Sequence, residues 1–178
     1  MITGRCRFNL YLLCAFCALA ALVAGCQSAE KKKQHQYATF RLHSEVYKES
    51  MDFSTTVPIF REKPVMVTIN KDPLITEADV ADARIVDDAG AWAIQIQFNR
   101  RGTWLLEQQS TSNPGRHVAI YSEWGQPKES RWLAAPVLKR RISDGRLNFT
   151  PDATHEEAEV IVMGLTNLVR EIEKKSKW

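Results

Sequence analysis

The chain has 178 residues and a mass of 20.3 kDa, which is typical of one domain with a small appendage. Apolar residues make up 44% and charged residues 25% of it, a globular composition that argues against a disordered or fibrous chain. The net charge is +3 and becomes +1 once Arg5 and Arg7 of the leader are set aside, so the basic excess of a nucleic-acid-binding domain is missing.

Residues 1–25 have the organisation of a bacterial lipoprotein signal peptide. Arg5 and Arg7 form a positive n-region, and the apolar stretch Leu10–Ala24 has 15 residues, whereas a membrane-spanning helix needs about 20. Small residues then precede Cys26, as in a lipobox. The alternative is an ordinary cleaved leader with an incidental cysteine, but the charge, length and cleavage residues together favour lipid attachment at Cys26.

The cysteines are all confined to the leader and the lipid site, so the folded part is expected to use neither disulfides nor thiol chemistry. Several acyl chains on one cysteine give stable anchoring, because each buried CH₂ contributes about 0.8 kcal/mol. Gln27 rather than Asp follows the lipid site, which in a Gram-negative host favours the outer membrane over the inner one. The chain is therefore expected to face the periplasm or the cell exterior.

Residues 26–36 are polar and predict a tether. Lys31, Lys32 and Lys33 fit a solvated linker; the alternative is attraction to anionic lipid head groups, about 1 kcal/mol per basic residue. At about 3.5 Å per residue the tether spans at most roughly 35 Å, so it would keep the domain near the membrane.

Residues 37–73 predict a small β-rich unit that leads into the main domain. Phe40 and Leu42 alternate with polar neighbours, and β-branched residues are frequent in Thr55–Phe60 and Val65–Ile69. Pro58 restricts its strand to an edge or an end of a sheet.

The main domain is predicted to run over residues 74–173. Trp92, Ile94, Ile96 and Phe98 alternate with glutamines and predict a strand with one buried face. Before this strand we expect a helical turn at Thr76–Val80, a strand from Ala83 to Val86 and a turn at Asp87–Gly90. After it we expect a helix over Arg100–Thr111, capped by Asn99, and strands at His117–Tyr121 and Trp132–Leu138. A turn at Ser143–Gly145 then precedes a strand with Leu147 and Phe149.

The last helix is predicted to begin with a capping box formed by Thr154 and Glu157. Its apolar residues recur at three- and four-residue spacing and should cover a sheet. This face comprises Ala158, Ile161, Val162, Leu165, Leu168, Val169 and Ile172. Among the tryptophans, Trp92 and Trp104 are expected in the core and Trp124 and Trp178 at the surface.

The residues suggest no catalytic, cofactor or metal site. The histidines His35, His43, His117 and His155 do not form a metal-binding spacing, and neither a glycine-rich phosphate loop nor a G-x-S-x-G motif is present. Asp87-Asp88 is expected in a turn and Glu156-Glu157 in a first helical turn, where acids favour the positive dipole end. We therefore expect no enzyme, no small-molecule substrate and no nucleic-acid partner.

A series of short motifs follows in order between Leu74 and Leu168. They are LITEADVADA at Leu74–Ala83, IQFNRRG at Ile96–Gly102, GRHVAI at Gly115–Ile120, AAPV at Ala134–Val137, and DGRLNFT at Asp144–Thr150 followed by EEA at Glu156–Ala158. Their order and spacing resemble the head of the first periplasmic domain of the SecD/SecDF protein-translocase family.

This resemblance implies an α+β fold: a mainly antiparallel sheet with two helices packed on one face. It also implies contact with exported preprotein outside the cytoplasmic membrane. The chain departs from the family's pattern because no transmembrane helix is expected after the leader, because Gly145 stands alone where the family has two glycines, and because Glu171–Lys175 replaces a small-residue exit. The family's proton-coupled pumping therefore does not carry over.

The expected function is that of a lipid-anchored, non-enzymatic binding module that contacts exported polypeptide or the translocation machinery. The alternative is a general envelope adaptor unrelated to translocation. An exposed strand edge could pair with an extended chain through main-chain hydrogen bonds, which predicts weak, sequence-tolerant binding. The near-zero charge predicts little salt dependence.

Overall fold

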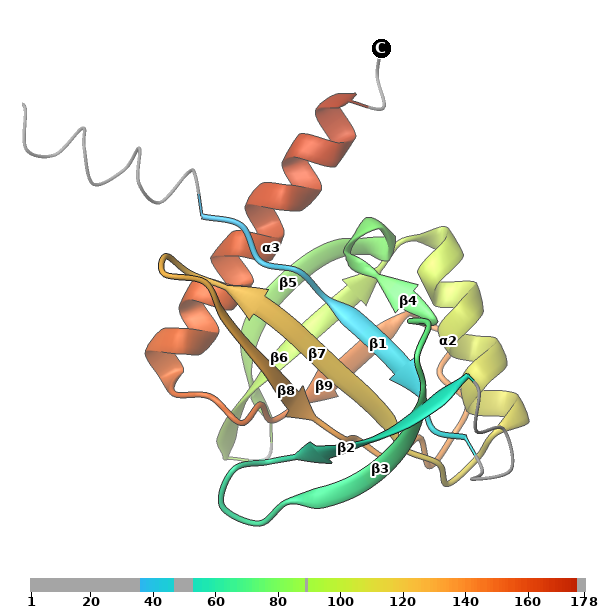
Figure 1. Cartoon of the computed structure of the whole chain (residues 1–178). Helices are drawn as coiled ribbons and strands as arrows, with labels where there is room; N and C mark the ends of the chain where they lie inside the picture. Colours follow the sequence, from blue (N-terminus) through green and yellow to red (C-terminus); the bar gives the residue numbers. More distant parts are fainter. Residues whose placement is uncertain (1–35, 47–52, 89, 176–178) are drawn as a thin grey trace, which may run out of the picture. The chain divides into compact units, whose positions relative to one another are not determined.

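The computed structural model describes residues 36–46, 53–88 and 90–175; the predicted leader, Cys26 and nearly all of the tether lie outside these residues. Figure 1 shows the arrangement of the elements. In chain order they are β1 (Arg41–Ser44), β2 (Ser54–Ile59), β3 (Val65–Asn70), β4 (Ile75–Thr76), the 3₁₀ turn η1 (Glu77–Asp79), β5 (Val80–Asp88), β6 (Ala91–Phe98), α2 (Arg100–Ser112), β7 (Val118–Trp124), β8 (Glu129–Ala134), β9 (Arg146–Phe149) and α3 (His155–Lys175).

The described strands form three antiparallel sheets, which confirms the predicted α+β class with antiparallel pairing. A four-stranded sheet has the order β4-β1-β7-β8, a three-stranded sheet the order β5-β6-β9, and β2 pairs with β3 alone. Leu42 lies opposite Ile120 in the first sheet and Ile96 opposite Leu147 in the second, so apolar residues share one face of each.

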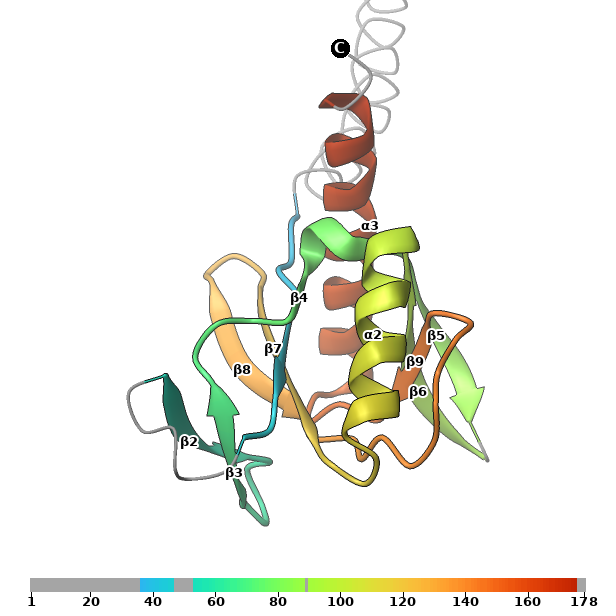
Figure 2. The ribbon, with the colours of Figure 1, turned by 90° about the vertical axis from the view of Figure 1, so that its right-hand side faces the viewer.

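The two helices of the predicted α+β fold lie beside the two larger sheets. The four-stranded and three-stranded sheets face each other, and α2 and α3 lie at opposite sides of the space between them (Figures 1 and 2). The rings of Phe40 and Phe98, one from each side of this space, have centroids 5.8 Å apart. Because each sheet is small and has one apolar face, the two faces bury each other, and the helices close the remaining sides.

The predicted β-rich lead-in contributes directly to this core. Its first strand, β1, is paired on both sides within the four-stranded sheet. The β2–β3 hairpin packs on the outer face of the same sheet, where Ile59, Val67 and Ile69 are buried with Ala119 of β7. Val46 N–H also donates to the Thr68 carbonyl at 2.9 Å, which ties the hairpin to the chain after β1.

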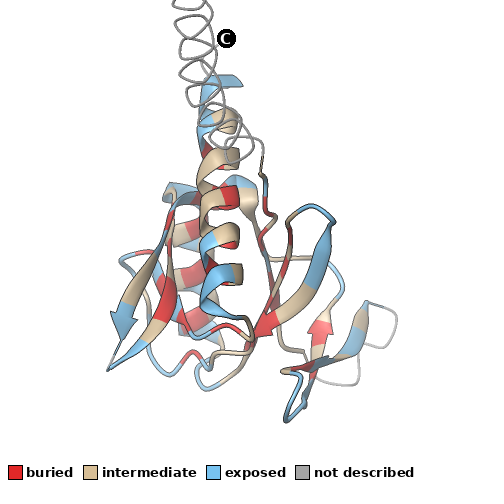
Figure 3. Cartoon of the chain, turned by 90° about the vertical axis from the view of Figure 1, so that its left-hand side faces the viewer, coloured by how far each residue is buried: buried red, intermediate tan, exposed pale blue. Residues whose placement is uncertain are grey.

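The predicted helix signals are confirmed at both helix starts. The Asn99 side chain accepts a hydrogen bond from the Gly102 N–H at 3.0 Å, and Thr154 and Glu157 form the reciprocal capping box of α3. Along α3, the positions Ala158, Ile161, Leu165 and Val169 are buried, whereas Val162, Leu168 and Ile172 are half-buried. Figure 3 shows this buried stripe along the helix.

Gly164 lets the chain after the tether pass close to α3. A Cβ atom at this position would lie 2.6 Å from the Ala38 nitrogen and 2.8 Å from the Tyr37 carbonyl carbon. Asn167, one turn further on, donates from Nδ2 to the Gln36 carbonyl at 3.0 Å. The start of the domain is thus fixed against the middle of its last helix.

Two of the tryptophan predictions are wrong. Trp124 is only 3% exposed, because β7 continues past Tyr121 and keeps Trp124 on the core face of Val118 and Ile120. Trp104 is 60% exposed, because α2 turns Gly102, Leu106 and Ser110 inward. Trp92 is half-buried, and Trp178 lies outside the described residues.

Leu165 tests the contribution of α3 to the core. It is 1% exposed, so Leu165→Ala should lower the free energy of unfolding by about 2–5 kcal/mol in urea denaturation. Glu159→Ala removes an exposed side chain of the same helix and should leave stability nearly unchanged. A loss below about 0.5 kcal/mol for Leu165→Ala would mean that α3 is peripheral.

Candidate functional site

The first two sequence motifs meet in space around the carboxylate of Asp79, which is 2% exposed. Its Oδ2 atom accepts a hydrogen bond from the Thr76 N–H at 3.1 Å, and its Oδ1 atom lies 2.6 Å from Arg101 Nη1. Asn99 N–H donates to the Asp79 carbonyl at 2.8 Å, and Asn99 Nδ2 donates to the Ala78 carbonyl at 3.0 Å. These contacts join η1 to the start of α2, and we call them the Asp79 cluster.

The motif DGRLNFT, which contains Gly145, joins the same region. Gly145 has a φ of +68°, and a Cβ atom there would collide with the Thr103 side chain. Its carbonyl accepts hydrogen bonds from the Phe98 N–H at 2.9 Å and from Gln97 Nε2 at 3.2 Å. The motif residues therefore hold η1, β6, α2 and the turn before β9 together, and their role in this geometry is to maintain the fold.

The paired carboxylates have structural partners. Asp87 and Asp88 lie at the end of β5 rather than in the predicted turn, because β5 pairs with β6 up to Asp88. Asp87 Oδ1 accepts from the Gly90 N–H at 3.1 Å, which stabilises the hairpin turn. Glu156 lies exposed in the first turn of α3, as predicted.

Glu157 makes a bidentate ion pair with Arg131 of β8, with N–O distances of 3.1 and 3.2 Å. Burial alone would raise the pKa of Glu157, but the hydrogen bonds from Arg131 and the Thr154 N–H, with the charges of Arg131 and Arg61, lower it. The carboxylate stays ionised and joins β8 to α3, so it has the properties of a structural group.

The described histidines have separate partners. His43 Nδ1 lies 2.9 Å from the Asn70 carbonyl, and burial lowers the pKa of this ring. His117 contacts Glu45 at 3.2 Å, and His155 contacts Glu159 at 3.5 Å. Within the part of the chain that the structure describes, no group of three His, Cys, Asp or Glu residues could hold a metal ion.

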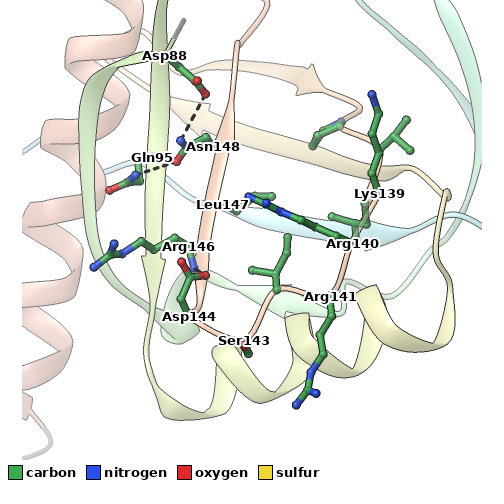
Figure 4. Close-up of a pocket in the computed structure, with 14 residues that line it drawn as sticks. Asp88, Gln95, Lys139, Arg140, Arg141, Ser143, Asp144, Arg146, Leu147 and Asn148 are labelled. Atoms are coloured by element: carbon green, nitrogen blue, oxygen red, sulfur yellow. Dashed lines mark hydrogen bonds between the residues drawn. The ribbon is translucent and has the colours of Figure 1, made fainter.

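A cleft of about 790 Å³ lies beside β9, and we call it the β9 cleft. One wall is β9 with the adjoining part of β6, and the other is the segment 136–144 that connects β8 to β9 (Figure 4). Its volume is in the range of small ligand sites. The sequence did not predict it, since its walls come together only when β9 pairs with β6.

The β9 cleft is lined by four basic side chains and two acidic ones. Arg141 forms an ion pair with Glu107, and Arg146 Nε donates to Gln97 Oε1 at 3.1 Å. Lys139 and Arg140 form no ion pair with any other described residue. Figure 4 shows Arg140 extending from its segment toward β9.

The free edge of β9 borders the same cleft. Phe98 N–H bonds to the Gly145 carbonyl, and hydrogen-bonded pairs alternate with non-bonded pairs along an antiparallel ladder. With Gln97 opposite Arg146 and Gln95 opposite Asn148, these two β9 residues direct their N–H and C=O groups away from β6. Asp144 Oδ1 satisfies the Arg146 N–H at 3.1 Å. The Arg146 carbonyl and both backbone groups of Asn148 remain outside the described ladders.

Several of the other strand edges are obstructed. Asp152 N–H donates to the Leu133 carbonyl of β8 at 2.7 Å, and β2 contains Pro58. β3 is bonded through Thr68 to Val46, and α3 packs against β5. The described structure thus combines an open strand edge with a bordering cleft at β9.

Comparison with known proteins decides the family. The family model described as "SecDF, P1 head subdomain" matches residues 44–167, which is more than half of the chain. The chain belongs to this family. The match confirms the predicted resemblance and begins before Leu74, so it includes the β2–β3 hairpin and β4.

Relatives of the P1 head extend the comparison. The protein translocase subunit SecDF of Thermus thermophilus is 32% identical over 94 residues, which cover 52% of this chain but only 12% of that protein. A solved structure of SecDF, described as a membrane component that enhances protein export, aligns with a TM-score of 0.52 and 24% identity over 79% of this chain and 67% of the other. A second, in a super-membrane-facing form, aligns with a TM-score of 0.51 and 22% identity over 79% of this chain and 20% of the other. These structural likenesses show the shared fold.

None of the helices in the described residues is long and apolar enough to cross a membrane.

The Asp79 cluster makes a testable prediction for this P1 head. Asp79→Ala leaves the Thr76 N–H and Arg101 without their acceptor, so it should lower the free energy of unfolding by about 1–3 kcal/mol. Asp82→Ala is the matched control, because Asp82 belongs to the same motif but is exposed. Equal effects of the two substitutions in chemical denaturation would contradict a structural role for the cluster.

Proposed function

We propose that the chain is a lipid-anchored binding module of the cell envelope that uses its P1 head to contact exported preproteins or the protein-translocation machinery. The observation that carries this proposal is the match of residues 44–167 to the SecDF P1 head family. Translocation is the activity named for the SecDF relative, and this chain spans only 12% of that relative's length. Binding without pumping is the part of that activity that we assign to this chain.

The proposed organisation follows from the leader. Residues 1–25 would be removed as a lipoprotein signal peptide, Cys26 would carry the lipid, and residues 26–36 would form the tether to the folded part, which begins at Tyr37. The head would lie within roughly 35 Å of the membrane surface, facing the periplasm or the cell exterior. In a Gram-negative cell, Gln27 favours the outer membrane.

A non-enzymatic role is part of the proposal. Three carboxylates of the head, Asp79, Asp152 and Glu157, each have a basic partner that links elements of the fold. The β9 cleft contains backbone groups, four basic side chains and two acidic ones, and among its described residues no nucleophile is paired with a base. Such a surface suits recognition of a polypeptide.

The anchor is tested at the mature amino terminus. Mass spectrometry of the protein purified from membranes should find Cys26 as the first residue and acylated. Cys26→Ala should release the protein from the membrane fraction or leave it uncleaved, and Cys17→Ala is the matched control inside the leader. An unmodified Cys26, or a mature chain that starts at Gln27, would contradict lipid anchoring.

Binding is tested by co-purification from native membranes. The tagged chain should enrich translocase subunits or exported precursors, relative to an unrelated tagged lipoprotein that carries the same 36-residue leader and tether. Reproducible capture of other envelope proteins, without these two classes, would instead support the general adaptor function.

A further inference from the structure

We infer that the β9 cleft binds an extended, acidic segment of polypeptide, which pairs with the edge of β9 as an added strand and places carboxylates beside Lys139 and Arg140. The inference rests on the proposed function, since it names the site and the class of segment recognised. The groups that would bind the segment are the outward backbone groups of β9 and the side chains of Lys139 and Arg140.

The main-chain part of the site is the outward edge of β9. Asn148 offers an N–H and a C=O in the same direction, and Arg146 offers a C=O. A partner strand needs this alternating pattern of donors and acceptors, and its own backbone supplies the complement whatever its side chains are. The edge can therefore bind many sequences, as contact with varied exported chains would require.

The edge of β9 is held in place by side-chain hydrogen bonds. Gln97 Nε2 bonds to the carbonyls of Asp144 and Gly145 at 3.1 and 3.2 Å, and this fixes the turn before β9. The Asn148 side chain accepts a hydrogen bond from Gln95 Nε2 at 2.9 Å on the outer face of the sheet. An incoming strand would thus meet a preorganised edge, which lowers the entropic cost of binding.

The charge of the cleft selects acidic segments. Both of its carboxylates already accept internal hydrogen bonds, Asp144 from the Arg146 N–H and Asp88 from Asn148 Nδ2. Lys139 and Arg140 lack ion-pair partners among the described residues, and Arg140 extends across the cleft toward β9 (Figure 4). Carboxylates on the bound segment would complement these two charges.

This local charge changes one expectation. The net charge of the mature chain predicted little dependence of binding on salt, because opposite charges nearly balance over the whole domain. The β9 cleft concentrates basic groups in one place, so binding there should weaken as salt screens them.

The test uses the full chain in detergent micelles and fluorescence anisotropy. The probe is a labelled peptide of about ten residues in which Glu alternates with Thr, long enough to extend beyond β9. The dissociation constant of the peptide should be micromolar or larger, and it should increase with added salt. A peptide with Gln in place of Glu should bind less well, and one with N-methyl groups on alternate residues should not bind, because it cannot pair as a strand.

Substitutions separate the backbone and charge contributions. Asn148→Pro removes the outward N–H and should weaken binding by about tenfold or more, since one hydrogen bond is lost and the edge is blunted. Asn148→Ala is its control, because it removes the same side chain but keeps that N–H. The pair Lys139→Glu and Arg140→Glu should also weaken binding and abolish its salt dependence, whereas Lys174→Glu, an exposed site outside the cleft, should do neither.

The outcomes distinguish this site from the proposed function. Loss of binding with Asn148→Pro but not Asn148→Ala, together with loss in the charge-reversed variants, supports strand addition at β9. Binding that none of these variants alters overturns the site but leaves a polypeptide-binding function. No binding of any peptide at millimolar concentration also overturns the site, and the co-purification experiment then decides the proposed function by itself.

Discussion

The fold depends on two small antiparallel sheets that share one hydrophobic core. Each has a single apolar face, and a sheet of three or four short strands gains too little from burying that face unless a second layer covers it. The two faces cover each other, with Phe40 and Phe98 in contact across the interior, while Leu106 of α2 and Leu165 of α3 fill the flanks. Because the helices close the sides rather than lie over one sheet, the outer faces and strand edges stay available for other uses. The β2–β3 hairpin occupies one outer face, and the edge of β9 remains open.

The Asp79 cluster and the Gly145 turn explain why short motifs identified the family. The motifs encode places where the chain must make a close or buried polar contact: a buried carboxylate at Asp79, a close helix approach at Gly102 and a positive φ at Gly145. Few residue types meet such demands, so the pattern is visible in one sequence. These positions hold the scaffold, and the proposed binding surface lies beside them on backbone groups that a sequence pattern does not register.

Local signals predicted most of the strands, both helix caps and the apolar stripe of α3, because capping and periodicity depend on residues close in sequence. The strand expected at Trp132–Leu138 is instead β8, which spans Glu129–Ala134. The existence of two facing sheets was not predicted, since it depends on which strands pair: β1 joins β7 across 78 residues, as in the pair Leu42 and Ile120. The prediction that Trp124 lies at the surface was wrong for the same reason, because its burial follows from the length of β7, which β1 and β8 stabilise. The β9 cleft depends on an edge, a connecting segment and the charge left unpaired there, and none of these is a local property.

The claim that one core holds both sheets is tested most directly by native-state hydrogen exchange. Protected amides in β6 and in β7 should exchange through the same global opening, with one free energy that equals the free energy of unfolding from denaturation, because neither sheet retains its buried face alone. The chain can be studied in its full length, since exchange is read residue by residue. If the amides of the three-stranded sheet open at a clearly lower free energy while those of β7 stay protected, the sheets are independent units and the shared-core account is wrong.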